Sequence, residues 1–456
     1  MPIEFQVIAA IQILWIAAGL WHFIHRSDEV VLLSSLLIGY YSGYRMWTLL
    51  SGVRQLGNIS NLGFAAVDEA AAFKALYAIV LGQCFLLGTY LLVQNRTFAS
   101  GHFRLAPALS AALQSKVVLA AIILLPATYW IKAFVAESFM GGFALNISAT
   151  AYIRLFPLVL STVAILLIFM WRFGGLDEGS RLLNLGLVGI LFWLTYGSQG
   201  RFQFLAWLVA GGLIVSAPYR PAMRLLLLTG ILAGAAMVFA LAGVQRNYSG
   251  EFENTVALDR IIRAEDANML EGFALMQQVI PSRFGYRYGM EHLETLIRPI
   301  PRAWWRGKPV GNYMLKVAGI DETKPSGTIG ISPSLFGSFY VELGYLGIIV
   351  LSTLYGLVMG RFMRWAAGLH PAPGLLVRGL VCASLVPLLR GGDLAGIFVV
   401  LAMSFWPFLL LLVFRHRQLR ADSSWFSSAG LAVAPAGSGR RAYYRSGRRG
   451  VAAAQR

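Results

Sequence analysis

Charged side chains are scarce in this chain. Asp, Glu, Lys and Arg together make up 13% of its residues, against roughly 25% in an ordinary soluble domain. The rest is correspondingly apolar, with 57% hydrophobic residues and a mean hydropathy of +0.65. A chain with so few charges and so many apolar residues does not have the composition of a soluble fold. Composition therefore predicts an all-α polytopic membrane protein.

Cysteine and the common cofactor motifs are also lacking. The two cysteines, Cys84 and Cys382, both fall in apolar runs, so no disulfide framework or thiolate metal site is expected in the polar part of the chain. The sequence contains no GxxxxGK[ST], HExxH, GxGxxG or DxD pattern. These absences argue against ATP hydrolysis, zinc proteolysis, dinucleotide chemistry and a metal-held nucleotide sugar. We expect no cofactor and no metal, so a substrate must carry its own energy.

Apolar runs of about 17 to 25 residues, the length that crosses a bilayer, recur along the chain. They predict about eleven spans, within a range of ten to thirteen. The predicted spans are 5–24, 29–50, 72–94, 117–136, 151–171, 182–197, 201–217, 223–243, 334–360, 374–390 and 394–414.

The predicted spans divide the chain into four parts. Residues 1–243 form an N-terminal bundle of about eight spans, and residues 334–414 form the last three. Between them, residues 244–333 hold eleven Lys or Arg and ten Asp or Glu, too many charges for hydrocarbon. Residues 415–456 form a basic tail, whose end beyond Ser423 is expected to be disordered.

Lys and Arg set the predicted orientation. The tail has nine Arg against one Asp, and basic residues beside a final span more often face an anionic cytoplasmic leaflet than nucleic acid. With the tail in the cytoplasm, eleven further basic residues lie on that side, and the loop 244–333 lies outside. Arg224 and Arg378 belong to these cytoplasmic residues. Four basic residues lie within or at the edge of spans: Arg45, Lys74, Lys132 and Arg154. We expect most of them to snorkel from helix ends.

The loop 244–333 shows helical periodicity. Apolar residues recur at helical spacing from Met269 to Ile280 and again from Met290 to Ile300. Glu294 and Arg298 are spaced to pair across one turn. We expect amphipathic helices that lie across the outer mouth of the bundle, followed by an irregular segment, 304–332, that returns toward the membrane.

Arginines gather at the predicted outer face. Two are in short turns and three in the loop: Arg201, Arg390, Arg298, Arg302 and Arg306. Guanidinium groups bind phosphate through two parallel hydrogen bonds and stay charged in partly desolvated sites. Each arginine alone is better explained by a structural role, but five on one face favour an anion site. We expect Arg201, Arg302 and Arg390 to line one cavity with Glu342.

Candidate bases and sugar-stacking residues lie nearby. Glu342 stands just inside a predicted span, where a lone carboxylate is costly and indicates a function. His292 lies on a predicted loop helix, where a plain surface position is the alternative. Trp304 and Trp305 are equally well explained as sugar-stacking residues and as interface anchors.

The residues that follow resemble the bacterial O-antigen polymerases, the Wzy-type oligosaccharide repeat-unit polymerases. The similarity is carried by short segments in a fixed order: Tyr286-Arg287-Tyr288-Gly289, Leu293, Ile300-Pro301-Arg302, Trp305, Lys308-Pro309, Gly330-Ile331-Ser332-Pro333-Ser334 and Glu342-Leu343-Gly344-Tyr345-Leu346-Gly347. The resemblance implies a GT-C-like fold in the bacterial inner membrane with a periplasmic loop, and possible partnership with a flippase and a chain-length regulator.

The resemblance also implies a reaction. A glycan on polyprenyl pyrophosphate is transferred, without a metal, to the terminal sugar of another lipid-linked repeat unit. Arg201, Arg298, Arg302 and Arg390 then bind pyrophosphate, assisted by Lys308. Tyr288, Trp304 and Trp305 contact sugar, and Glu342 or His292 is the base. In the family pattern the carboxylate near the start of this span often directly follows a glycine. In this chain Gly337 is followed by Ser338 and the acid comes only at Glu342. This departure leaves the identity of the base open. An O-antigen ligase and a flippase for lipid-linked sugars are the alternatives.

Overall fold

The computed structural model describes most of the chain. The described residues are 2–53, 67–98, 103–105, 107–140, 156–195, 201–247, 258–259, 261–264, 267–298, 300, 304–305, 308, 332–391 and 394–421. Arg302 and most of the segment 304–332 lie outside them, as does the tail after Ala421.

The described residues form helices and no named strand, as the composition predicts. In chain order the helices are α1 (Ile3–Arg26), α2 (Val30–Gly39), the π-helix η1 (Tyr40–Tyr44), α3 (Arg45–Leu50), α4 (Glu69–Val93), α5 (Pro107–Met140), the 3-10 helix η3 (Phe156–Val159), α7 (Leu160–Phe173), α8 (Glu178–Thr195), α9 (Arg201–Ser216), α10 (Pro221–Asn247), α12 (Met269–Val279), α13 (Met290–Ile297), α15 (Ser334–Ala366), α16 (Pro371–Arg390) and α17 (Leu394–Ala421).

Seven helical segments within the described residues are long and apolar enough to cross a membrane. They are α1, α4, the middle of α5, η3 with α7, the first part of α10, α15 and α16. Each of the other predicted spans also coincides with helix: 29–50 with the consecutive α2, η1 and α3, 182–197 with α8, 201–217 with α9 and 394–414 with α17. The protein is therefore a helical protein with several membrane-spanning helices.

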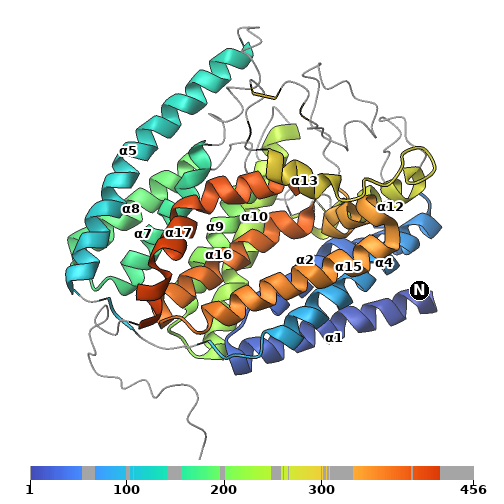
Figure 1. The fold of residues 1–456 in the computed structure, drawn as a ribbon, viewed down its shortest axis with the longest axis horizontal. Coiled ribbons are helices and arrows are strands. Elements are labelled where there is room, and N and C mark those ends of the chain that lie inside the picture. Colours follow the sequence, from blue (N-terminus) through green and yellow to red (C-terminus); the bar gives the residue numbers. More distant parts are fainter. Residues whose placement is uncertain are drawn as a thin grey trace, which may run out of the picture.

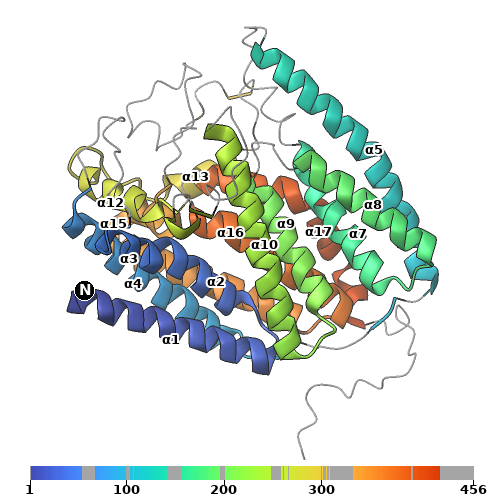
Figure 2. The same cartoon turned by 180° about the vertical axis from the view of Figure 1, so that it is seen from behind.

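The bundle is built around α15 and its neighbours. In Figures 1 and 2, α15 lies along α4, and α16 lies beside α9 in the middle of the molecule. Small residues permit the close approach of α15 to α4. A Cβ added at Gly360 would lie 2.9 Å from the Val93 Cβ, and one added at Gly356 would clash with the Leu86 carbonyl oxygen.

A buried charge cluster joins one end of the bundle. The Glu29 carboxylate, in the turn between α1 and α2, pairs with Arg224 of α10 and with Arg378 of α16, whose Nε lies 3.1 Å from Glu29 Oε2. Arg378 also donates to the Ser27 carbonyl oxygen at 2.8 Å. All three charged side chains are at most 3% exposed. Arg224 and Arg378, which were predicted on the cytoplasmic side, are thus both paired with a buried carboxylate.

One of the two predicted loop helices, α12, is buried more deeply than predicted. Both predicted loop helices are present as α12 and α13. However, α12 is buried over most of its length and packs against α4 and α15, so it does not present the exposed polar face expected of an amphipathic helix. Arg45 does not snorkel either. It is fully buried, its Nε donates to Glu271 Oε1 of α12 at 2.8 Å, and its Nη1 donates to the Arg263 carbonyl oxygen.

Candidate functional site at the break in helix α15

Helix α15 is broken inside its span, directly after Glu342. Leu343 has φ −149° and ψ 21°, and Gly344 has φ 64° and ψ −144°, values that do not continue a helix. Glycine is suited to Gly344 because side chains disfavour positive φ. A break leaves carbonyl groups of the preceding turn without partners in the helix. The loop before α13 supplies these partners: Arg287 N–H donates to the Val341 oxygen and Tyr288 N–H to the Glu342 oxygen, both at 3.0 Å.

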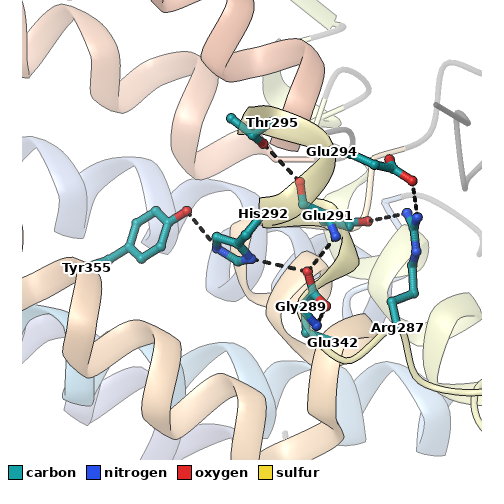
Figure 3. A network of polar contacts seen from close by, with 8 residues as sticks. All are labelled: Arg287, Gly289, Glu291, His292, Glu294, Thr295, Glu342 and Tyr355. Carbon is teal, nitrogen blue, oxygen red and sulfur yellow. Dashed lines mark hydrogen bonds and ion pairs between the residues drawn. The ribbon is translucent and has the colours of Figure 1, made fainter. Parts of the chain in front are cut away.

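The Glu342 carboxylate makes a second set of contacts between the broken helix α15 and the start of α13. It is fully buried and accepts hydrogen bonds from the backbone N–H groups of Gly289 and Glu291, the latter at 2.9 Å. These N–H groups belong to the start of α13, where unpaired amides and the helix dipole stabilise a negative charge. Figure 3 shows the carboxylate beneath this helix terminus. Glu342 therefore fixes α13 to α15.

His292 lies between Glu342 and Tyr355 (Figure 3). Its Nδ1 is 3.2 Å from Glu342 Oε1, and its Nε2 is 3.1 Å from the Tyr355 hydroxyl oxygen. Two backbone N–H donors, those of Gly289 and Glu291, converge on the Glu342 oxygens, which favours an ionised carboxylate that can only accept. Nδ1 must then carry the proton, so that in the neutral ring Nε2 is the acceptor and Tyr355 donates to it. This tautomer makes Nε2 the basic atom.

The His292 ring is partly exposed, whereas the Glu342 carboxylate is not. Its side chain is 31% exposed, against 1% for that of Glu342. Tyr355 stands on the second half of α15, and its ring contacts Phe339 of the first half, with centroids 4.9 Å apart. His292, Glu342 and Tyr355 therefore come from α13 and from both halves of the broken helix α15.

Arg287 completes the local network. Its guanidinium pairs with Glu294, and its Nη1 lies 3.8 Å from Glu291 Oε1. The pairing that sequence spacing predicted for Glu294 was with Arg298; the structure shows Glu294 bonded to Arg287, seven positions before it. Arg287 stands in the quoted motif without an assigned role, and Tyr355 was not selected from sequence. The Tyr355 contact depends on a helix break and a loop contact across 63 positions, for which helical spacing gives no signal.

The two residues predicted as alternative bases thus form one unit, while the predicted pyrophosphate site is only partly described. Arg390 ends α16, and Glu342 is not among the residues that line the cavity beside it. That Arg390 and Glu342 line one cavity with Arg201 and Arg302 stays a prediction. The Arg201 side chain lies outside the described part of the chain, although its backbone begins α9.

Lys308 and Arg298 meet at the end of α13. The Lys308 ammonium donates to the Arg298 and Ile300 carbonyl oxygens, both at 2.7 Å, and Lys308 is 7% exposed. Carbonyl groups at a helix C-terminus lack helical partners and favour a positive charge. In this structure Lys308 therefore caps α13, and its contact with pyrophosphate stays a prediction.

The predicted sugar-contacting side chains are accessible. Tyr288 is 72% exposed, Trp304 82% and Trp305 41%. Tyr288 has positive φ and contributes its backbone N–H to the broken end of α15, so its role in the fold is separate from any contact by its ring. Exposed aromatic rings near a polar cluster are suited to stacking on sugar faces or to an interface.

Among the described residues, no group of three or more His, Cys, Asp or Glu side chains is arranged to hold a metal ion. No family model matches this chain, and neither a curated protein nor a solved structure matches it. The structure itself thus defines the class: a helical membrane-embedded protein with a His-Glu-Tyr cluster at a broken helix.

Proposed function

We propose that this protein is a membrane glycosyltransferase that polymerises oligosaccharide repeat units carried on polyprenyl pyrophosphate, on the periplasmic side of the bacterial inner membrane. The observation that carries the proposal is the His292–Glu342 pair. A partly exposed imidazole whose Nδ1 is fixed by a buried carboxylate is suited to take a proton from an alcohol. The motif order that resembles the Wzy-type polymerases supports the same reaction.

In the proposed step, His292 Nε2 removes the proton from the acceptor sugar hydroxyl. The resulting oxygen attacks the anomeric carbon of the donor glycan. The bond from that carbon to the pyrophosphate oxygen breaks, and the lipid pyrophosphate leaves with the electron pair. Glu342 acts as a positioning residue that stabilises the imidazolium form, and it does not itself take the proton. This assigns His292, rather than Glu342, as the base.

Tyr355 occupies the place from which an acceptor hydroxyl must approach. Its hydroxyl is hydrogen-bonded to Nε2 in this structure. Either the Tyr355 hydroxyl moves aside when the acceptor binds, or it relays the proton of the acceptor hydroxyl to Nε2. Arginine is the predicted partner of the leaving group because a developing negative charge needs preorganised cationic donors. Arg390 is described at one end of α16, and Arg201 and Arg302 remain predictions from sequence.

The test is deletion of the gene in its source bacterium, followed by separation of carrier-linked and surface-linked glycans by size. A polymerase predicts single repeat units in place of the long-chain ladder, restored by the wild-type gene and not by His292→Ala expressed at the same level. An unchanged ladder contradicts the proposal. Full-length glycan stranded on the carrier lipid indicates an O-antigen ligase instead.

A transporter or flippase of lipid-linked sugars is the second candidate, and the break at Leu343 and Gly344 favours it. Discontinuous membrane helices often form the substrate sites of transporters. The same deletion separates the two: loss of a transporter leaves repeat units on the inner leaflet, inaccessible to a periplasmic glycosidase. Loss of a polymerase leaves them accessible on the outer leaflet.

A further inference from the structure

A second site lies away from the His292 cluster, where α5 begins and α7 leads into α8. A cavity of about 650 Å³ lies here, within the roughly 300 to 1,000 Å³ typical of small-molecule sites. Figures 1 and 2 show α5 and α8 side by side at the edge of the molecule. The turn between α7 and α8 and the start of α8 form one wall. The other wall is one face of α5, whose lining residues recur at helical spacing: Pro107, Ala111, Gln114, Ser115 and Val118.

Side-chain hydrogen bonds fix the spacing of the two walls. The amide groups of Gln114 on α5 and Asn184 on α8 exchange two hydrogen bonds, at 2.6 and 3.1 Å. The Ser110 hydroxyl of α5 donates to the Gly174 carbonyl oxygen just after α7. Because such contacts hold membrane helices together at a set distance, the cavity is a preformed feature of this end of the bundle.

Two side chains of opposite charge line the cavity. Arg104 stands just before α5. Its neighbours Phe103 and Leu105 both contact Phe173, the first by ring stacking and the second through its N–H, which donates to the Phe173 carbonyl oxygen at 3.1 Å. Asp177 stands just before α8. Both charged side chains are exposed, and these two described residues form no ion pair with each other. The cavity thus offers one cation and one anion to a ligand.

Asp177 is charged at neutral pH. The hydroxyl and the backbone N–H of Ser180 both donate to its carboxylate, the N–H at 3.1 Å, and these hydrogen bonds hold the pKa of Asp177 below its ordinary value. This contact caps the start of α8. An ionised carboxylate has about four lone-pair sites, so Asp177 can cap the helix and still accept hydrogen bonds from a ligand.

We propose that this cavity binds the headgroup of phosphatidylethanolamine, a phospholipid that carries both a phosphate and a primary ammonium, with the phosphate at Arg104 and the ammonium at Asp177. A ligand with both charges pairs with both side chains, whereas an anionic headgroup has no group to pair with Asp177. A primary ammonium donates three hydrogen bonds, and the Ser115 and Ser180 hydroxyl oxygens are further acceptors in the wall. A quaternary ammonium donates none and is bound by aromatic rings, and none of the described residues that line this cavity is aromatic.

The apolar part of the wall favours a phospholipid over free phosphoethanolamine. The apolar span of α5 begins at Leu109, and the cavity follows that span as far as Val118, with Leu183 of α8 also in its wall. The charged groups therefore lie at the start of the span, and the hydrocarbon of a bound lipid can extend along α5. The inference rests on this cavity and not on the transfer reaction, so it stands or falls separately from the proposed function.

The experiment uses the purified full-length protein, stripped of lipid in detergent. Native mass spectrometry compares the binding of three phospholipids with the same acyl chains: phosphatidylethanolamine, phosphatidylglycerol and phosphatidylcholine. We expect phosphatidylethanolamine to bind about tenfold more tightly than the other two, the ratio that one charged hydrogen bond gives. Equal binding of the three would overturn the proposal. Displacement of the lipid by an equal concentration of water-soluble phosphoethanolamine would overturn it as well, because the apolar wall would then contribute nothing.

Asp177→Asn separates lipid binding from helix capping, because asparagine caps a helix about as well as aspartate but carries no charge. This variant should lose the preference for phosphatidylethanolamine over phosphatidylglycerol. Glu178→Gln, which removes an exposed carboxylate outside the cavity, should keep it. Arg104→Gln should weaken binding of both lipids about tenfold, whereas Arg181→Gln, at an exposed position on α8 outside the cavity, should not. Equal effects of a variant and its control contradict the proposed location. If a cavity variant does not fold, the comparison of the three lipids on the unaltered protein decides the question.

Discussion

Glu342→Gln tests the hydrogen bonds that hold α13 against α15, because glutamine has nearly the same shape as glutamate. In the wild-type protein, Glu342 Oε2 accepts from Gly289, and Oε1 accepts from Glu291 and His292. An amide has only one accepting oxygen, and its nitrogen is a donor. Whichever way the amide is turned, at least one of the three donors therefore faces an N–H group.

The magnitude follows from these contacts. A hydrogen bond to a charged group contributes about 1.5 to 3 kcal/mol, and a buried donor left unsatisfied costs a similar amount. We expect Glu342→Gln to lower the unfolding free energy by about 1.5 to 3 kcal/mol. The effect on transfer should be larger, because His292 loses both its fixed tautomer and the charge that stabilises its protonated form. General base catalysis contributes roughly 10²- to 10⁴-fold, so we expect a loss in that range.

Glu294→Gln is the matched control. Glu294 is equally buried on α13 and pairs with Arg287, but it makes no described contact with His292. Both variants should lose similar stability in thermal unfolding of the detergent-solubilised protein, whereas only Glu342→Gln should lose the glycan ladder at equal expression. Equal loss of the ladder in both variants, or a normal ladder in Glu342→Gln, would refute the reasoning.

Three further changes test other parts of the structure. Gly344→Ala should cost about 1 to 3 kcal/mol of stability because of its positive φ, whereas Gly189→Ala, at an open position on α8, should be neutral or slightly stabilising; thermal melting compares them. Glu29→Ala leaves two buried arginines without their carboxylate and should cost about 3 to 5 kcal/mol, seen as a loss of folded protein by size-exclusion chromatography. Tyr355→Phe removes one neutral hydrogen bond worth about 0.5 to 1.5 kcal/mol and should lower the transfer rate about tenfold or less, measured from ladder length over time.

The membrane helices could be predicted from sequence because their signal is local. Each predicted span coincides with helix in the described residues, since a long apolar run is sufficient to indicate a helix in lipid. The two loop helices were also predictable from their spacing. Their depth was not, because the burial of α12 depends on packing against α4 and α15, which are distant in the chain.

For the polar contacts too, some features could be predicted from the local sequence and others could not. A carboxylate inside an apolar run identified Glu342, and periodicity placed His292 on a helix, but nothing local showed that they meet across 50 positions. Arg45 was expected to snorkel because a lone cation in an apolar run gives no sign of its partner. That partner, Glu271, lies 226 residues away.

The central claim is that His292 is the base that activates an acceptor hydroxyl. The most direct measurement is the size distribution of surface glycan in cells whose only copy of the gene encodes His292→Gln, with the protein present at the wild-type level. We predict single repeat units on the carrier lipid and its surface acceptor, with no long-chain ladder. A ladder of wild-type length in these cells would contradict the account.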